Sequence, residues 1–361
     1  MKKLSYVIID GQWGSTGKGL IAGYLAIKVC PDTAVCNFGP NAGHTVVMPD
    51  GREVMTQMLP SAIVSPHVKT ILIGPGAIVD PKILKAELDK YDDLVKDKRI
   101  FIHDMATIIK QEHKDREAAE LNRISSTCKG TGAAQTDKVM RIEGAVARDC
   151  ADLPICAIRG LDFTRLLQES QILQIESAQG LELGLNSGGW YPYCTSRDVN
   201  VHQVLSDCAI PYSFPRSKVV VSMRTYPIRV GNAFDSEGNL IGTSGPVYPD
   251  QEEVTWEQLG QKVERTTVTK KIRRVFTWSH LNFEKVITML NPDAIFLNFV
   301  NYYEENPTFV SPITRSKVYE IEQHYNRCIL TMGDTSPIIR WIGTGPKITD
   351  VLQRRDNNEF V

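Results

Sequence analysis

The sequence lacks the features that mark several broad classes of protein. Its eight cysteines include no C-x-x-C pair, so neither a zinc site nor a disulfide framework is indicated, and free, buried thiols are expected. No apolar run approaches the length of a membrane span. The first short run, Leu4 to Ile9, ends at the acidic Asp10, which does not fit a signal peptide. We therefore expect a soluble, cytoplasmic protein that does not bind membranes.

An excess of positive charge is also absent. Lys and Arg total 41 against 42 for Asp and Glu, which gives a formal net charge of -1. A protein that binds nucleic acid directly normally carries a basic excess to neutralise phosphates, so we do not expect that function. A local cationic pocket for one nucleotide is still compatible with the balance. The 361 residues show no internal repeat or low-complexity linker, and we expect one domain over residues 1–361.

The apolar runs that are present predict an α/β fold. Leu4 to Ile9 is typical of a buried strand, and a Gly-rich segment and a helix over Lys18–Val29 follow it. Further strands are expected at Thr33–Phe38, Thr70–Ile73, Ile100–Ile102, Ile172–Ile175, Lys218–Ser222 and Ala294–Phe299, and further helices at Pro81–Tyr91, Phe163–Gln168, Val199–Cys208 and Phe283–Leu290. This alternation predicts a large, mainly parallel central sheet with surrounding helices and inserted functional loops.

The segment Gly11–Gly19 (Gly-Gln-Trp-Gly-Ser-Thr-Gly-Lys-Gly) is the best single indication of chemistry. Its glycines would let the backbone approach phosphates, and the helix that follows would direct N–H groups towards them. It differs from a standard P-loop, because Gly19 stands where Ser or Thr would bind magnesium. Its glycine spacing also does not fit a dinucleotide fold. A tight structural turn is the alternative to nucleotide binding.

Two other stretches have the composition of functional loops. Ser125–Asp137 is rich in Gly, Ser and Thr, which suits a backbone nest for an anion. Arg265–Arg274 holds five cations and three hydroxyls in ten residues. A solvated basic loop is the usual explanation for such a charge run, but the hydroxyls favour recognition of carboxylate or phosphate.

Several blocks of sequence resemble one known family. Gln12-Trp13-Gly14-x-x-Gly17-Lys18-Gly19 and Asn41–Val47 (Asn-Ala-Gly-His-Thr-Val-Val) are similar to two signatures of adenylosuccinate synthetases. Asp137-Lys138-x-x-Arg141, Glu176–Gly180 and Tyr191–Ser196 match three more blocks, in family order. These enzymes couple aspartate to C6 of IMP and use GTP as phosphoryl donor. The resemblance covers nearly the whole chain and implies a ligase with this fold.

The resemblance also implies a two-step mechanism. The donor γ-phosphate moves to O6 of a 6-oxopurine, and the amino group of aspartate then attacks C6 and expels phosphate. Lys18 and Mg²⁺ would supply positive charge, and His44 would donate to the developing O6 and phosphate oxygens. A homodimer is implied as well, because the family's counterpart of Arg141 reaches the active site of the partner subunit.

The matching positions assign residues to each part of the site. The resemblance implies catalytic roles for Ser15, Lys18 and His44, and magnesium binding by Ser15 and the Gly43 carbonyl. It implies donor binding by Ser15, Thr16, Gly17, Lys18, Gly19, Thr45, Asn298, Asn301, Gly343 and Gly345. It implies binding of the monophosphate substrate by Ser15, Asn41, Thr127, Arg141, Gln179 and Thr195, and of aspartate by Thr269 and Arg273.

The first departure from the family pattern concerns the substrate. The family's loop reads Gly-Asp-Glu-Gly-Lys-Gly, and its Asp takes the N1 proton of the purine and binds Mg²⁺; here Ser15 stands in that place. Serine is too weak an acid for this role without activation. An inactive paralogue is one explanation, but the retained Lys18 and His44 favour a changed substrate. Ser15 would leave space for a 2-amino group, which resembles the phage-type branch of the family that acts on dGMP. The location would then be the cytoplasm of the host.

Further departures concern the ribose and the donor. The family places Arg near the ribose hydroxyl where this chain has Lys271, and weaker ribose recognition would suit a deoxynucleotide. The family reads guanine with Thr-Lys-x-Asp, and the aligned residues here are Asn298-Phe299-Val300-Asn301. The amide of Asn301 suits adenine better than a carboxylate does. The sequence therefore predicts ATP or dATP as donor, and leaves the choice between them open.

Two alternatives remain at this point. An ordinary adenylosuccinate synthetase with an unusual loop would act on IMP with GTP. A catalytically silent nucleotide-binding or regulatory protein would bind nucleotide without releasing phosphate. The favoured prediction is a ligase that joins L-aspartate to dGMP and yields N6-succino-2-amino-2′-deoxyadenylate, ADP and phosphate for the synthesis of 2-aminoadenine (diaminopurine) DNA.

Overall fold

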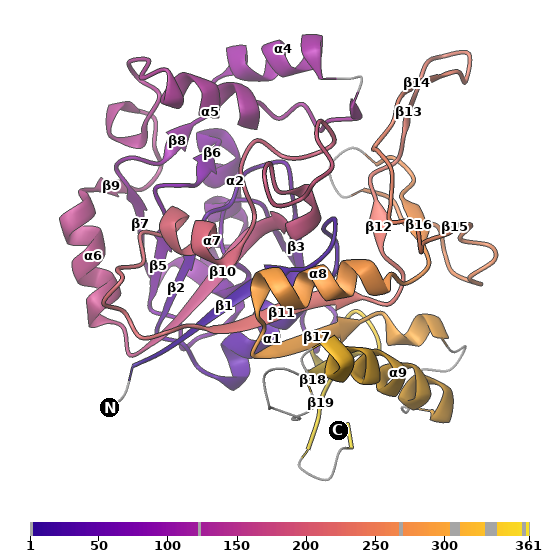
Figure 1. Ribbon diagram of the computed structural model, residues 1–361. Helices are drawn as coiled ribbons and strands as arrows, with labels where there is room; N and C mark the ends of the chain where they lie inside the picture. The colour runs from indigo at the N-terminus through magenta and orange to yellow at the C-terminus, as the bar shows by residue number, and fades with distance from the viewer. Residues whose placement is uncertain are drawn as a thin grey trace.

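A ten-stranded sheet forms the centre of the molecule (Figure 1). The computed structural model describes residues 3–121, 124–266, 270–303, 311–328, 338–355 and 359–360. The strand order is β19-β18-β17-β11-β1-β10-β2-β5-β7-β9, and only β18 and β19 run antiparallel to each other. The strands are β1 (Leu4–Asp10), β2 (Thr33–Cys36), β5 (Thr70–Ile73), β7 (Arg99–His103), β9 (Cys156–Ile158), β10 (Ile172–Gly180), β11 (Lys218–Arg224), β17 (Ala294–Asn298), β18 (Ile339–Gly343) and β19 (Val351–Gln353).

Helices cover both faces of this sheet because its central strands are apolar on both sides. Ile8 of β1 belongs to one core, and Val7 and Ile9 belong to the other. The first core includes α1 (Lys18–Lys28), α2 (Pro81–Lys90) and α3 (Asp92–Val95), and the second includes α6 (Gly160–Glu169), α7 (Val201–Asp207), α8 (His280–Leu290) and α9 (Pro312–Cys328). The three-layer arrangement confirms the predicted α/β class.

Short strands and two further helices lie outside the central sheet. The small sheets comprise β3 (His44–Val47) with β4 (Glu53–Thr56), β6 (Ile78–Val79) with β8 (Thr107–Ile108), β13 (Ala233–Phe234) with β14 (Leu240–Gly242), and β12 (Ile228–Arg229), β16 (Arg274–Phe276) and β15 (Glu253–Val254) together. The helices are α4 (Gln111–Glu120) and α5 (Thr131–Val139), which lie side by side (Figure 1). The sequence predicted inserted loops, and it did not predict these short strands or the helix α4.

The predicted strands and helices that were named all occur, with small shifts at their ends. The strand expected at Thr33–Phe38 stops at Cys36, and directly after it the Asn37 side chain accepts from the Ala178 backbone N–H. The stretch Ser125–Asp137 is a loop only in part, since α5 begins at Thr131. The seven described cysteines are free, but only Cys36 and Cys208 are buried, so the expectation of buried thiols holds for those two.

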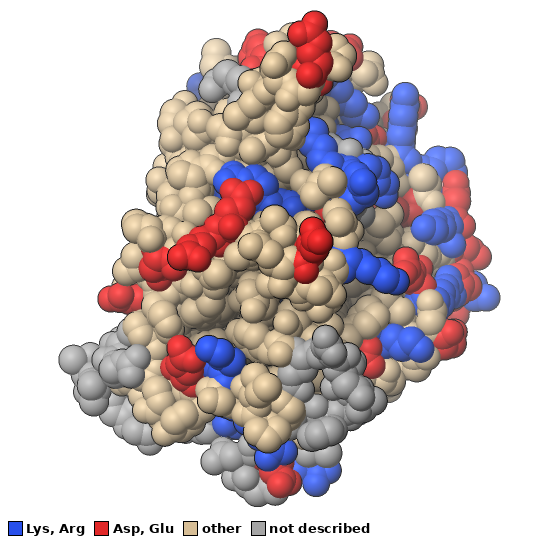
Figure 2. Space-filling view, turned by 90° about the vertical axis from the view of Figure 1, so that its right-hand side faces the viewer, with Lys and Arg blue, Asp and Glu red and all other residues tan. Residues whose placement is uncertain are grey.

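The surface agrees with the near-neutral charge. Figure 2 shows Lys and Arg interspersed with Asp and Glu over one face, and no continuous basic surface is visible there. Among the helices that the structure describes, none has both the length and the apolar character to cross a bilayer.

Candidate functional site

A cavity of about 800 Å³ opens at the carboxyl ends of the central strands. β1 lies between β10 and β11, and residues at or beside the ends of these strands and of β17 line or border the cavity, among them Gln179 and Asn298. β10 and β11 follow each other in the chain but lie on opposite sides of β1. In open α/β sheets, ligands bind at the carboxyl ends of the strands where the strand order reverses in this way. A smaller cavity of about 170 Å³ adjoins it and shares Trp13, Asn41 and Thr127 with it.

The Gly-rich loop enters the main cavity in a fixed conformation. Gly14 and Gly17 have φ values of 91° and 90°, and Ser15 has a φ of 56°, which is uncommon for a residue with a side chain. Asp10, fully buried, accepts from the Gln12 backbone N–H at 2.8 Å and from the Thr16 hydroxyl at 2.6 Å. These contacts hold the loop in place and account for the left-handed Ser15.

Lys18 is buried at the start of α1, and its ammonium group lies among acceptors. It donates to the Gln179 carbonyl at 2.8 Å and lies 3.7 Å from the Asp10 carboxylate. Burial lowers the pKa of Lys18, while the charges of Asp10 and Glu176 act in the opposite direction. A cation held in this way beside a Gly-rich loop is suited to binding phosphate.

His44 presents a neutral ring to the same cavity. Its ring stacks on Phe38 with a centroid distance of 4.1 Å and an interplanar angle of 7°. Burial and the neighbouring Lys18 charge hold the pKa of His44 well below its ordinary value. A neutral imidazole with a fixed ring plane can donate one hydrogen bond to a charge that develops on a substrate oxygen.

Several buried polar atoms around the cavity have no hydrogen-bond partner in the described structure. They include His44 Nε2, Gln179 Nε2 and Trp13 Nε1. Buried polar groups are nearly always satisfied, so unpartnered donors beside a cavity indicate that a ligand supplies their acceptors. Gln179 also has a φ of 63°, and strained residues of this kind gather at functional sites.

Arg273, predicted to bind aspartate, contacts the Gly-rich loop directly. Its Nη1 donates to the Ser15 hydroxyl. Burial lowers the pKa of Arg273 to about 10, with Glu264 opposing this shift, and the side chain remains cationic at neutral pH. Thr269, the other predicted aspartate-binding residue, lies outside the described residues.

The predicted donor-binding residues fall into two groups. Thr45, Asn301 and Gly345 line the cavity together with the loop residues 17–19. Asn298 lines it too, but its amide donates to the Thr16 carbonyl at 3.2 Å and its Oδ1 accepts from the Phe299 N–H at 2.8 Å. Thr16 and Gly343 do not line the cavity. Gly343 instead makes room for Asn298, because a Cβ there would lie 2.0 Å from Asn298 Oδ1.

The predicted substrate-binding residues lie close together, with one exception. Asn41, Thr127 and Gln179 line both cavities, and Thr195 lines the smaller one. Arg141 lies elsewhere: it follows α5, is exposed and has a φ of 62°.

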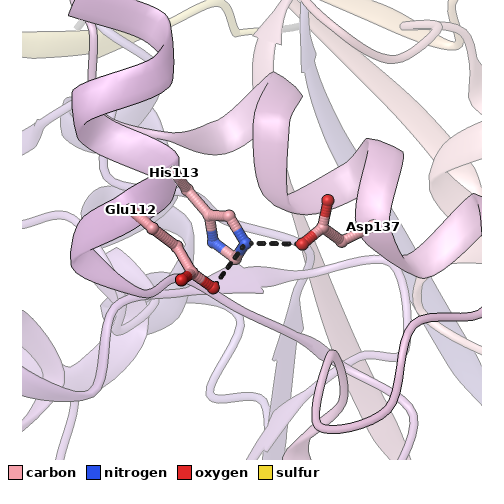
Figure 3. Close-up of side chains that lie close together, drawn as sticks. All are labelled: Glu112, His113 and Asp137. Atoms are coloured by element: carbon pink, nitrogen blue, oxygen red, sulfur yellow. Dashed lines mark hydrogen bonds and ion pairs between the residues drawn. The ribbon is translucent and has the colours of Figure 1, made fainter.

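Contacts between α4 and α5 hold the segment that carries Arg141. Glu112, His113 and Asp137 lie together there (Figure 3). His113 Nδ1 accepts from the Lys110 N–H at 3.0 Å, which leaves the ring proton on Nε2, 3.0 Å from Asp137. Arg116 also donates to Asp137, at 2.8 Å. These contacts indicate a structural clamp between the two helices and not a metal site.

The backbone nest expected in Ser125–Asp137 is filled by the protein itself. Glu117 of α4 accepts from the N–H groups of Gly130 and Gly132 at 2.7 and 2.6 Å. The interpretation of this segment as a nest for a substrate anion is therefore wrong at these two N–H groups, because an internal carboxylate satisfies them.

Sequence reasoning missed several residues that the fold brings to the site. Arg224 is fully buried, donates to the Ser15 carbonyl at 3.2 Å and pairs with Glu264, which lines the cavity. The Gln12 amide, part of the first signature, bonds the backbone of Arg224 in both directions. The charge run at Arg265–Arg274 was the only nearby signal in the sequence, and it did not extend to Glu264 or Arg224.

The oxygen donors expected for magnesium fit a site that substrate completes. Ser15 and Gly43 both line the main cavity. A hydroxyl and a carbonyl are hard oxygen ligands of the kind that Mg²⁺ accepts, and the ion usually takes further oxygens from water and substrate phosphates. The chemistry of this donor set is therefore compatible with a nucleotide-bound Mg²⁺.

Comparisons with known proteins identify relatives of this chain. The family model described as adenylosuccinate synthetase matches residues 7–157. The N6-succino-2-amino-2′-deoxyadenylate synthases of Salmonella phage PMBT28 and Acinetobacter phage SH-Ab 15497 are 39% and 42% identical to the chain; the first match covers 97% of both chains, and the second covers 84% of this chain and 85% of the relative.

A solved structure is similar over nearly the whole chain. It is the cyanophage S-2L succinoaminodeoxyadenylate synthetase (PurZ) bound to dGMP and dATP as an energy donor. It has a TM-score of 0.84 and 36% identity, and the match covers 99% of this chain and 97% of that one. The shared fold, the cavity and these relatives lead to one conclusion: the chain belongs to the adenylosuccinate synthetase family.

Proposed function

We propose that this protein is a ligase that joins L-aspartate to C6 of dGMP, with ATP or dATP as phosphoryl donor. The products would be N6-succino-2-amino-2′-deoxyadenylate, the nucleoside diphosphate and phosphate, as a step towards 2-aminoadenine DNA. The observation that carries the proposal is the uncharged Ser15 in a cavity that retains Lys18 and His44. Relatives that are named for this reaction or contain dGMP and dATP support it.

In the first step the γ-phosphoryl group leaves the donor as the nucleoside diphosphate is released, the O6–P bond to dGMP forms, and the N1 proton of the base is lost to solvent. The donor phosphates would lie against the loop 14–19, where Lys18 leaves the Gln179 carbonyl and binds phosphate oxygens. Mg²⁺, held by Ser15, Gly43 and the phosphates, would neutralise phosphate charge when bound. His44 Nε2, which has no partner in the described structure, would donate to O6 or to the phosphate.

The substrate would occupy the region where the two cavities meet. Asn41 and Thr127 line both cavities, and Gln179 offers an unpartnered amide donor. Ser15 would lie beside the base edge, where a hydroxyl leaves room for the 2-amino group of guanine. The Ser15 oxygen accepts from Arg273, so its hydrogen is free to donate to the substrate.

Aspartate would bind near Arg273 and Thr269. Arg273 lines the cavity close to Ser15, so a carboxylate bound to its guanidinium would bring the aspartate amino group towards the purine. Attack on C6 forms the C–N bond and releases the phosphate from O6.

The donor base would bind at the wall made by Phe299, Asn301 and Gly345. These residues line the main cavity, and the Asn301 amide can match both the donor and the acceptor on the adenine edge. Phe299 presents an aromatic ring for stacking, and it has a φ of 60°.

A homodimer would complete the substrate site with Arg141. Val139, Met140 and Ile142 surround Arg141 and are 66%, 67% and 51% exposed. Three exposed apolar side chains in one short segment suit a protein interface, and the α4–α5 clamp holds the segment in position. In a symmetric dimer each Arg141 would enter the site of the other subunit.

The test is a matrix of IMP, GMP and dGMP against ATP, dATP and GTP, each with aspartate, measured as phosphate release. We expect the highest kcat/KM with dGMP and ATP or dATP. Faster turnover of IMP with GTP would instead identify an ordinary adenylosuccinate synthetase. Nucleotide binding by calorimetry without phosphate release would identify a silent binding protein.

A further inference from the structure

Arg224 and Glu264 form an ion pair beside the main cavity, in which Glu264 lines the cavity and Arg224 is buried behind it. Glu264 Oε1 lies 2.6 Å from Arg224 Nη2, and its Oε2 lies 3.2 Å from Nη1. Arg224 is 0% exposed, and Tyr302 donates to Glu264 at 2.7 Å. Burial raises the pKa of Glu264, but Arg224 and Tyr302 more than offset this and hold it below its ordinary value. Glu264 is therefore ionised at neutral pH.

One side of this pair holds the Ser15 region. Arg224 Nη1 donates to the Ser15 carbonyl at 3.2 Å. Glu264 Oε2 lies 3.9 Å from Arg273 Nε, and Arg273 donates to the Ser15 hydroxyl. Glu264 thus lies between two guanidinium groups that would otherwise repel each other, and both of these groups contact Ser15.

The other side of the pair contacts the donor wall, the part of the cavity made by Phe299, Asn301 and Gly345 where the donor base is proposed to bind. The Arg224 guanidinium lies 3.9 Å from the centre of the Phe299 ring, and the Tyr302 ring meets Phe299 at 5.2 Å in an edge-on arrangement. A guanidinium stacked on an aromatic ring is attracted to it, and the attraction is stronger where water is excluded. The left-handed Phe299 is therefore supported by the same Arg224 that holds Ser15.

We propose that Arg224 and Glu264 act as a positioning pair that joins the donor wall to Ser15 and Arg273. This inference rests on the proposed function, because it assigns aspartate to Arg273 and the donor base to Phe299. The proposed function assigns neither Arg224 nor Glu264 to a substrate. The pair aims Arg273 at the aspartate site, and a change at the donor wall reaches that site through Arg224. Binding of aspartate then depends on residues that do not touch it.

The neighbouring strands offer a matched comparison. Arg274 also pairs with a glutamate, Glu253, through contacts of 2.9 and 2.6 Å, and it also lies over a phenylalanine ring, Phe276, at 5.0 Å. None of these three residues lines the main cavity. Glu253→Gln therefore removes a similar ion pair without touching the proposed positioning pair.

The experiment measures KM for each of the three substrates with the other two saturating. Glu264→Gln keeps the side-chain shape and removes the charge between Arg224 and Arg273. We expect it to raise KM for aspartate about tenfold or more, the size expected for lost charge-assisted hydrogen bonds, and to change KM for dGMP by less than about twofold. Phe299→Leu should raise KM for both the donor and aspartate. Glu253→Gln should leave all three values near those of the wild type.

Tyr302→Phe provides a milder variant, because Glu264→Gln leaves Arg224 buried without its charge partner and can impair folding. It removes only the hydroxyl that donates to Glu264, and a rise of a few-fold in KM for aspartate alone is expected. Equal rises in all three KM values, or an unchanged KM for aspartate in both variants, would overturn the inference. A wild-type protein that does not turn over dGMP would overturn the proposed function instead.

Discussion

Replacing Ser15 by Asp restores the family's usual residue, and the structure predicts that this harms the reaction with dGMP. Asp tolerates the left-handed backbone at this position better than most residues, so the φ of 56° does not forbid the change. The longer carboxylate would instead crowd the space proposed for the 2-amino group. It would also meet Arg273, which now donates to the Ser15 hydroxyl.

The size of the effect follows from that contact. A hydrogen bond to a charged group contributes about 1.5–3 kcal/mol, and every 1.4 kcal/mol corresponds to about tenfold in binding. An Asp at position 15 would engage Arg273 as an ion pair in competition with substrate aspartate. We therefore expect KM for aspartate to rise at least about tenfold in Ser15→Asp, with lower kcat for dGMP.

Two further variants separate shape from charge in the same steady-state assay. Ser15→Asn has nearly the shape of Asp and no charge, so it should impair dGMP by crowding but leave KM for aspartate nearly unchanged. Ser15→Ala removes the hydroxyl without crowding. Unchanged or improved turnover of dGMP by Ser15→Asp would refute this account of the loop.

Three other changes test separate parts of the site. Asp10→Asn should move the alkaline limb of kcat/KM to lower pH. Burial lowers the pKa of Lys18 and the Asp10 charge opposes that shift, so without this charge the active, protonated Lys18 would be lost earlier as pH rises. An unmoved limb in a pH–rate profile would contradict this. Gly343→Ala should raise KM for the donor and lower the free energy of unfolding in urea by about 1–3 kcal/mol, because its Cβ would lie 2.0 Å from Asn298 Oδ1. A KM and a urea midpoint equal to those of the wild type would exclude this contact. The Arg141→Ala and Lys18→Ala proteins should each be inactive, and mixing them one to one after reversible dissociation should restore about a quarter of wild-type activity. About half of the dimers would then be mixed, and one of the two sites in each would be intact. No recovery, with mixed dimers confirmed by mass, would argue against a shared site.

The sequence by itself determined the family and the mainly parallel sheet, and it predicted residues that lie around one cavity. These features are local: an apolar run predicts a strand, and Gly11–Gly19 after such a run predicts a phosphate-binding turn. Asn41, His44 and Gln179 lie in short blocks, and the fold brings all three to one cavity because parallel strands end at the same edge of the sheet.

Only the tertiary structure decided how these residues are held. Arg224 and Ser15 are 209 residues apart in the chain, and Arg273 and Ser15 are 258 apart, yet both arginines bond Ser15. Composition and periodicity carry no information about which side chains meet across such separations. For the same reason the sequence did not show that Glu117, and not a substrate, binds the N–H groups of Gly130 and Gly132. A sequence motif specifies which chemical groups are available, and packing of distant segments determines which of them remain free for a ligand.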